Sequence, residues 1–166
     1  MTRAATRAIA ALAAAQVPHR VLRYHHDPRR RSFGAEAVEQ LAGADPGPTD
    51  LAAMQVFKTL IVAIPPGLAV AVLPVPSKLS LKAVAAALGV ARASMADPAV
   101  AERSTGYVVG GISPFGQRTT LPTVVDASAL GWDRVACSAG QRGWDVSVAP
   151  QDLIRLTGAV TADICA

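Results

Sequence analysis

The chain has 166 residues, of which 51% are hydrophobic, 4% aromatic and 17% charged, and its formal net charge is +4. This length predicts a single domain, residues 1–166, that can enclose a core without disulfides or metals. Cys137 and Cys165 form no CxxC pair and have no histidine nearby, which argues against a disulfide framework or a zinc site and predicts two free thiols. The modest positive charge suits a polyanionic partner.

The first segment, Met1–Gln16, is basic and rich in alanine, and no acidic residue precedes Asp27. A targeting peptide shares these features, but Arg7 interrupts the apolar run. We therefore expect a surface helix with Thr2 as its N-cap and Arg3 and Arg7 on one face. The expected location is the cytoplasm.

An uncharged stretch of 19 residues, Thr59–Ser77, is nominally long enough to span a bilayer. Pro65-Pro66-Gly67 at its centre breaks a helix, so a hairpin with arms Gln55–Ile64 and Leu68–Leu73 is the better interpretation. No membrane partner is expected.

Capping and turn residues predict the other elements. Ser80 and Gly89 bound an amphipathic helix at Leu81–Leu88. Asp97 as N-cap and Pro98 as first residue begin another helix. The remaining expectations are a strand at Pro18–His25, a turn at Asp27-Pro28, a helix capped by Ser32 and running to about Leu41, a loop at Gly43–Asp50, a short strand within "GYVVGGISPFGQ", strands in "LPTVVDA", "RVACSAG" and "RGWDVSVA", and a closing helix from Pro150 to about Leu156. Because several adjacent strands are joined by tight turns, mixed α+β is expected over a doubly wound parallel sheet.

Common catalytic motifs are missing from the sequence. It holds no GxxxxGK[ST], no GxGxxG after a strand, no HExxH and no GxSxG. His25 and His26 are adjacent on a predicted strand and would point to opposite faces, so we expect exposed or structural histidines and no metal. No cofactor is expected either.

Lys58 is the unusual cation, because it interrupts a stretch that otherwise reads as buried sheet. It either extends to solvent from a sheet edge or lies in a cleft where it meets an anion. Gly110 and Gly111, in "GGISP", either let backbone N–H groups approach a ligand or form an ordinary turn. Ser104 and Thr105 could add hydroxyl donors or serve in capping.

Asp145, in "RGWDV", needs a partner in a β-rich setting, and the alternative to a functional role is an ion pair with Arg142 or Arg134. A second charged feature is a group of five arginines interleaved with Tyr24 and Phe33, which suits either a nucleic-acid surface or a solvated loop. These arginines are Arg20, Arg23, Arg29, Arg30 and Arg31.

The ordered motifs "YHHDP", "FGAEAV", "VFKTLIV", "RSTGYVVGGISPFGQ" and "RGWDVSVAPQDL" closely resemble the YbaK/EbsC family of free-standing Cys-tRNA(Pro) deacylases, relatives of the prolyl-tRNA synthetase editing domain. The resemblance runs from about Ala5 to Asp163. It implies a single α+β domain with a mixed, barrel-like sheet flanked by helices, and a cleft for the acceptor end of a mischarged tRNA(Pro). Prolyl-tRNA synthetase is the implied protein partner.

The same resemblance implies the site. Lys58 would be its principal residue, Tyr24 and Phe33 would form the pocket, Gly110 and Gly111 would line it through their backbone, and Asp145 would belong to it. The resemblance also implies that the protein supplies no nucleophile, because the cysteine thiol of the substrate attacks its own ester. Our hypothesis is that Lys58 and the two glycine amides stabilise charge at the ester oxygen.

Departures from the family pattern concern specificity. The loop at Gly43–Met54 is long, "GQRTTLPT" carries fewer cations, and Trp144 replaces a smaller aliphatic and is expected to reshape the pocket near Asp145. The alternatives are a deacylase for Ala-tRNA(Pro) or another small misacylated tRNA, and a non-catalytic tRNA- or synthetase-binding module of the same fold.

Overall fold

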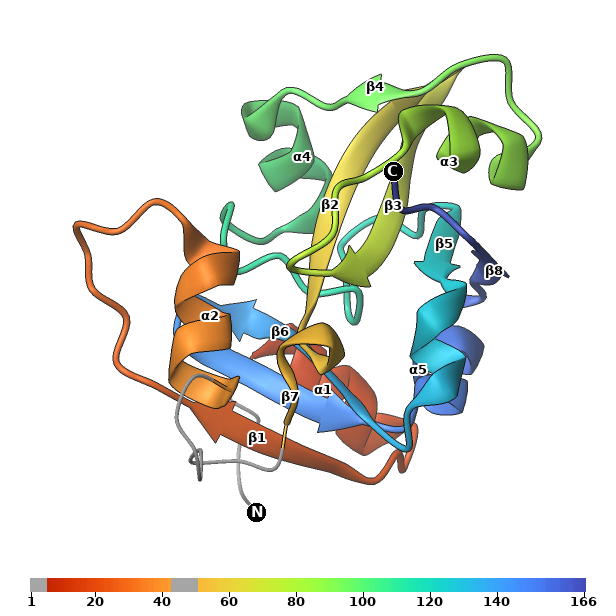
Figure 1. Cartoon of the computed structure of the whole chain (residues 1–166). Coiled ribbons are helices and arrows are strands. Elements are labelled where there is room, and N and C mark those ends of the chain that lie inside the picture. The colour runs from red at the N-terminus through yellow and green to blue at the C-terminus, as the bar shows by residue number, and fades with distance from the viewer. Residues whose placement is uncertain (1–5, 43–50) are drawn as a thin grey trace.

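The computed structural model describes residues 6–42 and 51–166. Within these ranges, helices and strands are interspersed along the chain, and two sheets meet at the centre of the molecule (Figure 1). The helices are α1 (Arg7–Ala14), α2 (Phe33–Ala42), α3 (Leu81–Leu88), α4 (Pro98–Thr105) and α5 (Pro150–Thr157), with short 3-10 helices η1 (Ala53–Gln55) and η2 (Ala127–Gly131). The strands are β1 (His19–Arg23), β2 (Phe57–Ile64), β3 (Gly67–Pro74), β4 (Ser94–Met95), β5 (Thr123–Asp126), β6 (Val135–Gln141), β7 (Trp144–Val148) and β8 (Val160–Ala162).

The smaller sheet is antiparallel in the order β1-β7-β6, and the larger is mixed in the order β4-β2-β3-β5-β8. A parallel bridge between Val56, just before β2, and Ala136 in β6 joins the two sheets. Strands β2 and β3 pair over their whole length, with Lys58 opposite Leu73. Asp145 lies in the central strand of the smaller sheet, between Leu22 and Ser138.

The main core fills the space between the two sheets and takes Leu12 from α1, Leu153 from α5 and Phe115 from the loop after α4, all fully or almost fully buried. A second core lies under α3, where Val84 packs with β3, β5 and the C-terminal segment. Alanine and valine dominate both cores. Among the described residues, no helix combines the length and the apolar character needed to cross a membrane.

Most of the predicted elements are confirmed. The hairpin turns at Pro65-Pro66 between Ile64 and Gly67. Ser80 caps α3 by accepting from the Ala83 N–H at 3.1 Å, and Gly89 ends that helix in the left-handed conformation. Asp97 caps α4 by accepting from two backbone N–H groups. Helix α2 starts directly after Ser32, as expected, whereas the loop at Gly43–Asp50 lies outside the described residues.

Three local expectations are wrong or incomplete. Helix α1 begins at Arg7 and is capped by Thr6, whose hydroxyl accepts from the Ile9 N–H; Thr2 lies outside the described residues. "GYVV" forms no strand, because Tyr107 is buried and its hydroxyl donates to the Phe115 carbonyl at 2.6 Å, which fixes a loop. Strands β4 and β8 are not evident from the sequence, since two or three residues are too few to show alternation.

Candidate active site

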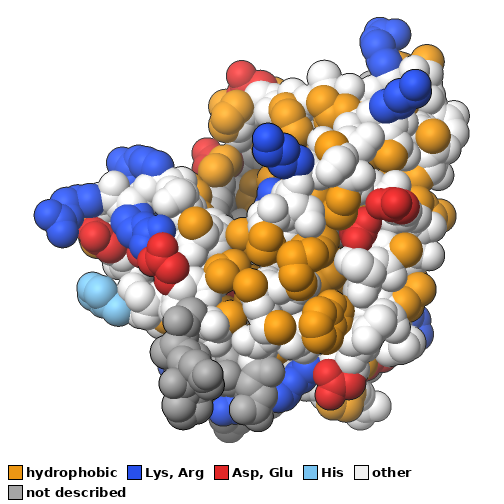
Figure 2. Space-filling model, in the orientation of Figure 1, with side chains coloured by type: hydrophobic (Ala, Val, Ile, Leu, Met, Phe, Trp, Pro, Cys, Tyr) orange, Lys and Arg blue, Asp and Glu red, His pale blue; other side chains and the backbone are white. Residues whose placement is uncertain are grey.

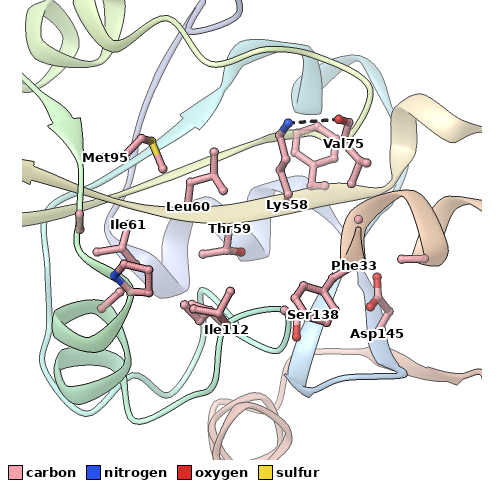
Figure 3. A pocket seen from close by; sticks show the side chains of 18 of the residues that line it. Phe33, Lys58, Thr59, Leu60, Ile61, Val75, Met95, Ile112, Ser138 and Asp145 are labelled. Atoms are coloured by element: carbon pink, nitrogen blue, oxygen red, sulfur yellow. Dashed lines mark hydrogen bonds between the residues drawn. The ribbon is translucent and has the colours of Figure 1, made fainter. Parts of the chain in front are cut away.

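A cavity of about 300 Å³ opens where the two sheets approach each other, and its lining is mostly apolar. Several separate parts of the chain contribute to it, which explains why no contiguous motif marks the site. They are Tyr24 after β1, the start of α2, the first half of β2 with Val75, the β4–α4 segment, the loop at Val109–Ile112, and Ser138 and Asp145 of the smaller sheet. Figure 3 shows side chains of these parts facing a common space.

The cavity follows one edge of β2. Lys58 and Leu60 extend from one face of this strand and Thr59 and Ile61 from the other, yet all four line the cavity (Figure 3). Strand β4 pairs only with the end of β2, at Val62 and Ala63. Among the described residues, the first half of β2 therefore has no strand neighbour on that edge. Residues of both faces therefore reach one space.

Lys58 lies in this cavity with its ammonium held by backbone. Its Nζ donates to the carbonyl oxygens of Val75 at 3.2 Å and Ser77 at 2.7 Å, both in the segment that leaves β3 and folds back over the lysine. In the described ranges no carboxylate forms an ion pair with it. Burial lowers the pKa of Lys58 below its ordinary value. Lys58 therefore lies in a cavity, and that it meets an anion there stays a prediction. After its two hydrogen bonds the ammonium has one N–H left to donate.

Thr59 is a site residue that sequence reasoning missed. Its Oγ1 is buried and has no hydrogen-bond partner among residues 6–42 and 51–166. The Ile61 carbonyl accepts from the Ala96 N–H beside β4, so by the period of two the Thr59 N–H and C=O face the same open edge. A buried hydroxyl without a partner is costly, which marks this position as one where a ligand atom could supply the missing bond.

Asp145 reaches the cavity from the opposite side, in the smaller sheet. It is 5% exposed, and the described part of the chain offers it no ion pair; neither Arg142 nor Arg134 fills that role. Burial raises the pKa of Asp145 to about 7. Burial, followed by the charge of Asp145, also raises the pKa of Tyr24 above its ordinary value. A carboxyl of this kind, in a cavity and poised near neutral pH, is typical of functional sites.

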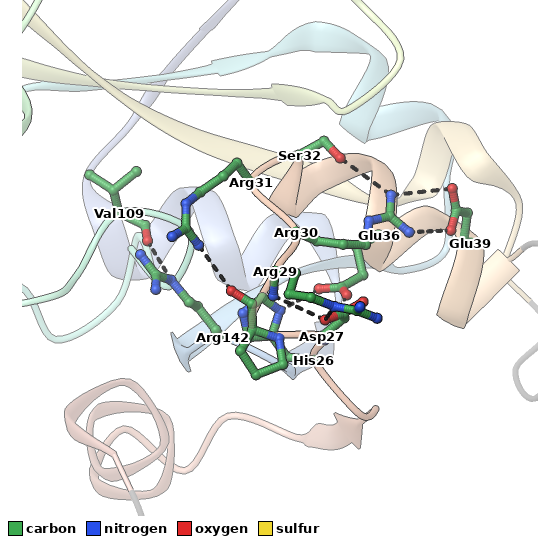
Figure 4. Close-up of polar contacts among 11 residues, drawn as sticks. His26, Asp27, Arg29, Arg30, Arg31, Ser32, Glu36, Glu39, Val109 and Arg142 are labelled. Atoms are coloured by element: carbon green, nitrogen blue, oxygen red, sulfur yellow. Dashed lines mark hydrogen bonds and ion pairs between the residues drawn. The ribbon is translucent and has the colours of Figure 1, made fainter.

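The buried carboxylate of Glu36 holds in place the segments that carry Tyr24 and Phe33, the two aromatic residues of the cavity lining that the sequence predicts. Glu36 accepts from the His26 ring at 2.6 Å and from the Asp27 N–H at 3.0 Å, and these bonds hold its pKa below the usual value although burial acts to raise it (Figure 4). This clamp ties the start of α2 to the chain after β1. Phe33, at the first position of α2, and Tyr24 are brought to the cavity as predicted, and His26 is structural.

The two glycines have different roles. Gly110 lines the cavity at φ 88°, and a Cβ there would lie 2.5 Å from the Phe33 ring, so a side chain is excluded by both backbone and space. Gly111 is buried behind it, and its N–H already donates to the Val108 carbonyl at 2.8 Å. Of the two amides in the hypothesis, only that of Gly110 has no partner in the described chain.

Ser104 and Thr105 are not brought to the cavity lining. The Thr105 hydroxyl donates to the Ala101 carbonyl at 2.8 Å and accepts from the Tyr107 N–H, which ends α4 and fixes the following loop. The Ser104 carbonyl accepts from the Thr119 N–H at 3.1 Å. Both residues therefore lie outside the cavity lining, and Thr105 fixes the start of the loop that carries Gly110.

Trp144 also lies away from the cavity, because it alternates with Asp145 along β7 and packs under the Arg23 guanidinium, 4.0 Å from the ring centre. The expectation that Trp144 reshapes the pocket is therefore wrong, since its side chain does not line the cavity.

Both cysteines are free, as predicted.

The described residues hold one group with metal-binding geometry, Asp126, Asp163 and Cys165. The Asp126 carboxylate already accepts from Ser128 and from the Ile164 N–H, and none of the three residues lines the cavity. These hydrogen bonds account for the carboxylate without a metal.

The site and fold define an α+β domain with a lysine at the edge of an apolar cavity, and comparison with known proteins gives its family. The model of the aminoacyl-tRNA editing domain matches residues 33–156. The Enterococcus faecalis (strain ATCC 700802 / V583) protein named "Putative Cys-tRNA(Pro)/Cys-tRNA(Cys) deacylase EbsC" is 34% identical over 133 residues, which cover 80% of this chain and 77% of that protein.

Two solved structures share the fold. One, described as "a putative trans-editing enzyme for prolyl tRNA synthetase", has a TM-score of 0.78 at 24% identity and covers 96% of this chain and 95% of its own. The other, a hypothetical protein, has a TM-score of 0.81 at 24% identity and covers 97% and 100%. The chain belongs to the aminoacyl-tRNA editing domain family. The predicted family, the mixed α+β fold and the class of aminoacyl-tRNA deacylase are confirmed.

Proposed function

We propose that this chain is a trans-editing hydrolase that deacylates mischarged Cys-tRNA(Pro), with the thiol of the substrate as the first nucleophile. One observation carries the proposal: a small apolar cavity contains the cation Lys58, but no histidine or cysteine is among its described lining residues. Asp145 lies opposite Ser138 in the smaller sheet, but no hydrogen bond in the described chain joins the hydroxyl of Ser138 or of Thr59 to a base. A protein nucleophile would need such a base, so catalysis falls to positioning and charge stabilisation.

The chemistry balances without a protein nucleophile. The sulfur of the cysteinyl group bonds to its own ester carbonyl carbon, and the ribose oxygen leaves with the thiol proton. Water then opens the thiolactone to free cysteine. Charge develops on the carbonyl oxygen during the first step, and preorganised donors at that place stabilise the transition state, each by about 2.7–4 kcal/mol.

The side chains of the cavity suit distinct parts of this substrate. The unused N–H of Lys58 and the free N–H of Gly110 are donors for the carbonyl oxygen. Asp145, when ionised, accepts from the substrate ammonium, and that contact would lower its pKa. Tyr24 and Phe33 provide aromatic surface for the terminal adenosine. These assignments make Lys58 a positioning charge and not a base.

A second candidate substrate is Ala-tRNA(Pro), which the apolar lining by Ile61, Met95 and Ile112 would accept. The experiment that tests both is deacylation of tRNA(Pro) charged with cysteine or alanine by the wild type and by Lys58→Ala, with and without prolyl-tRNA synthetase, the proposed partner. Loss of Cys-tRNA(Pro) hydrolysis in Lys58→Ala supports the proposal. Turnover of Ala-tRNA(Pro) alone would select the second candidate, and binding without turnover of either would reject hydrolysis. Because the substrate is a charged tRNA, we place the activity in the cytoplasm.

A further inference from the structure

Arg142, in the turn between β6 and β7, lies beside the cavity and makes two side-chain contacts there. Its Nε donates to the Val109 carbonyl at 2.9 Å (Figure 4). Its guanidinium lies over the Phe33 ring, 4.4 Å from the centroid. Val109 and Phe33 both line the cavity. The guanidinium therefore has a fixed position relative to the pocket.

The outer end of this guanidinium is free to bind. The described residues provide no carboxylate partner for Arg142, and Asp145 is not one although it lies three residues away. The nearby acid that contacts the same loop, Glu102, accepts from the Val109 N–H at 2.7 Å. With Nε engaged, the two Nη groups form an unpaired fork, the geometry that matches a phosphate with two parallel hydrogen bonds.

The neighbouring arginines differ in whether an acidic residue already pairs with their charge. Lys and Arg side chains, with acidic ones among them, gather over α2 and the segment before it (Figure 2). Arg29 pairs with Asp27 at 3.4 Å and Arg30 with Glu39 at 2.5 Å, so these two charges are offset. Arg31 donates to the Pro28 carbonyl at 3.0 Å and forms no ion pair within the described chain, so it is a second available cation of this region.

We propose that Arg142 is a phosphate-binding residue that holds the 5′-phosphate of the terminal adenosine, the group that links this nucleotide to the rest of a tRNA. The assignment rests on the proposed function, since it needs an aminoacyl adenosine in the cavity. Phe33 then lies between the phosphate seat and the pocket. The arginine gains affinity for every tRNA alike, because a phosphate contact carries no base identity.

The test compares adenosine with adenosine 5′-monophosphate, two ligands that differ only in the phosphate. Binding to the wild type, to Arg142→Gln and to Arg92→Gln is followed by chemical-shift titration. Arg92 is an exposed arginine after α3, outside the cavity lining, and serves as the matched control. We expect the monophosphate to bind the wild type and Arg92→Gln about tenfold or more tighter than adenosine, and this preference to vanish in Arg142→Gln.

A purely structural role of Arg142 would weaken both ligands equally and leave the preference intact, which would overturn the proposal. Equal binding of both ligands by the wild type would overturn it as well. Failure of the proposed function is a separate result: the preference would persist while no charged tRNA is hydrolysed. The catalytic counterpart uses cysteinyl esters of the same two compounds, for which Arg142→Gln should raise KM only for the phosphorylated one.

Discussion

The charged residues on two sides of the cavity differ in the partners that surround them. On the β2 side, Lys58 is half-buried and its ammonium is bonded to two backbone carbonyls. On the β7 side, Asp145 is almost fully buried and has no ion-pair partner in the described chain. Burial disfavours the charged form of each, lowering the pKa of the lysine and raising that of the aspartate. The charge of Lys58 is therefore held in place by hydrogen bonds, whereas the charge of Asp145 depends on the pH.

The largest effect should come from the ionisation of Asp145, whose pKa is about 7 in the folded chain and 3.8 ordinarily. Between these values the native state binds more protons than the unfolded state, so stability falls as pH rises through this window. Relative to Asp145→Asn, the free energy of unfolding of the wild type should fall by up to about 4 kcal/mol between pH 4 and pH 8. Urea unfolding at a series of pH values measures this. Parallel curves for both proteins would contradict a buried, unpaired carboxyl.

Removing the fixed charge should have the next largest effect. Lys58→Ala should lower kcat/KM for the charged tRNA about 100- to 1000-fold, because it deletes one preorganised donor. Lys82→Ala is the matched control, since that lysine is exposed on α3 and should leave the rate unchanged. Steady-state deacylation with circular dichroism of both variants makes the comparison. A Lys58→Ala protein that is folded and fully active would remove the lysine from the site.

The glycine that touches Phe33 offers a smaller, steric perturbation. Gly110→Ala must place a Cβ 2.5 Å from the ring at a positive φ, and we expect a loss of stability of about 1–3 kcal/mol with reduced activity. Gly131→Ala is the control, because a Cβ added there would meet nothing within 4 Å and the φ of this glycine is not positive. Thermal unfolding of the two variants distinguishes them. Equal unfolding midpoints for the two variants would show that the Phe33 ring moves aside without loss of stability.

Thr59→Val should produce the smallest change in stability and in the opposite direction. The substitution removes a buried hydroxyl without a partner in the described chain, so the free energy of unfolding should rise by about 1 kcal/mol. Deacylation should nevertheless fall if a substrate atom completes that hydrogen bond. Urea unfolding and kcat/KM are measured on the same preparation, with Thr161→Val, an exposed threonine of β8, as control. A loss of stability would indicate that the hydroxyl is satisfied in the native protein.

The sequence predicts the parts of the site whose signal is local. Lys58 stands out as a cation in an apolar strand, and caps at Ser80 and Asp97 follow from residue type alone. The family resemblance then brings Tyr24, Phe33 and Gly110 to the same cavity, and the structure agrees.

The parts that the sequence does not reveal depend on contacts between distant segments. Arg142 becomes notable only when Val109 and Phe33 come together around it. Thr59 becomes notable only because β4 is too short to pair with the first half of β2. Thr105 lies in a recognisable motif, yet its hydroxyl serves the end of α4 and the loop beyond. Motif membership alone does not separate residues that face the cavity from those that build its walls.

The central claim is that the cavity positions the ester while the substrate supplies the nucleophile. The most direct test compares single-turnover hydrolysis of Cys-tRNA(Pro) and Ser-tRNA(Pro) by the wild-type chain, because the two esters differ by one sulfur-to-oxygen exchange. The account predicts rapid release of cysteine and little release of serine. Equal rates for the two would show that the thiol is not the nucleophile and would contradict the account.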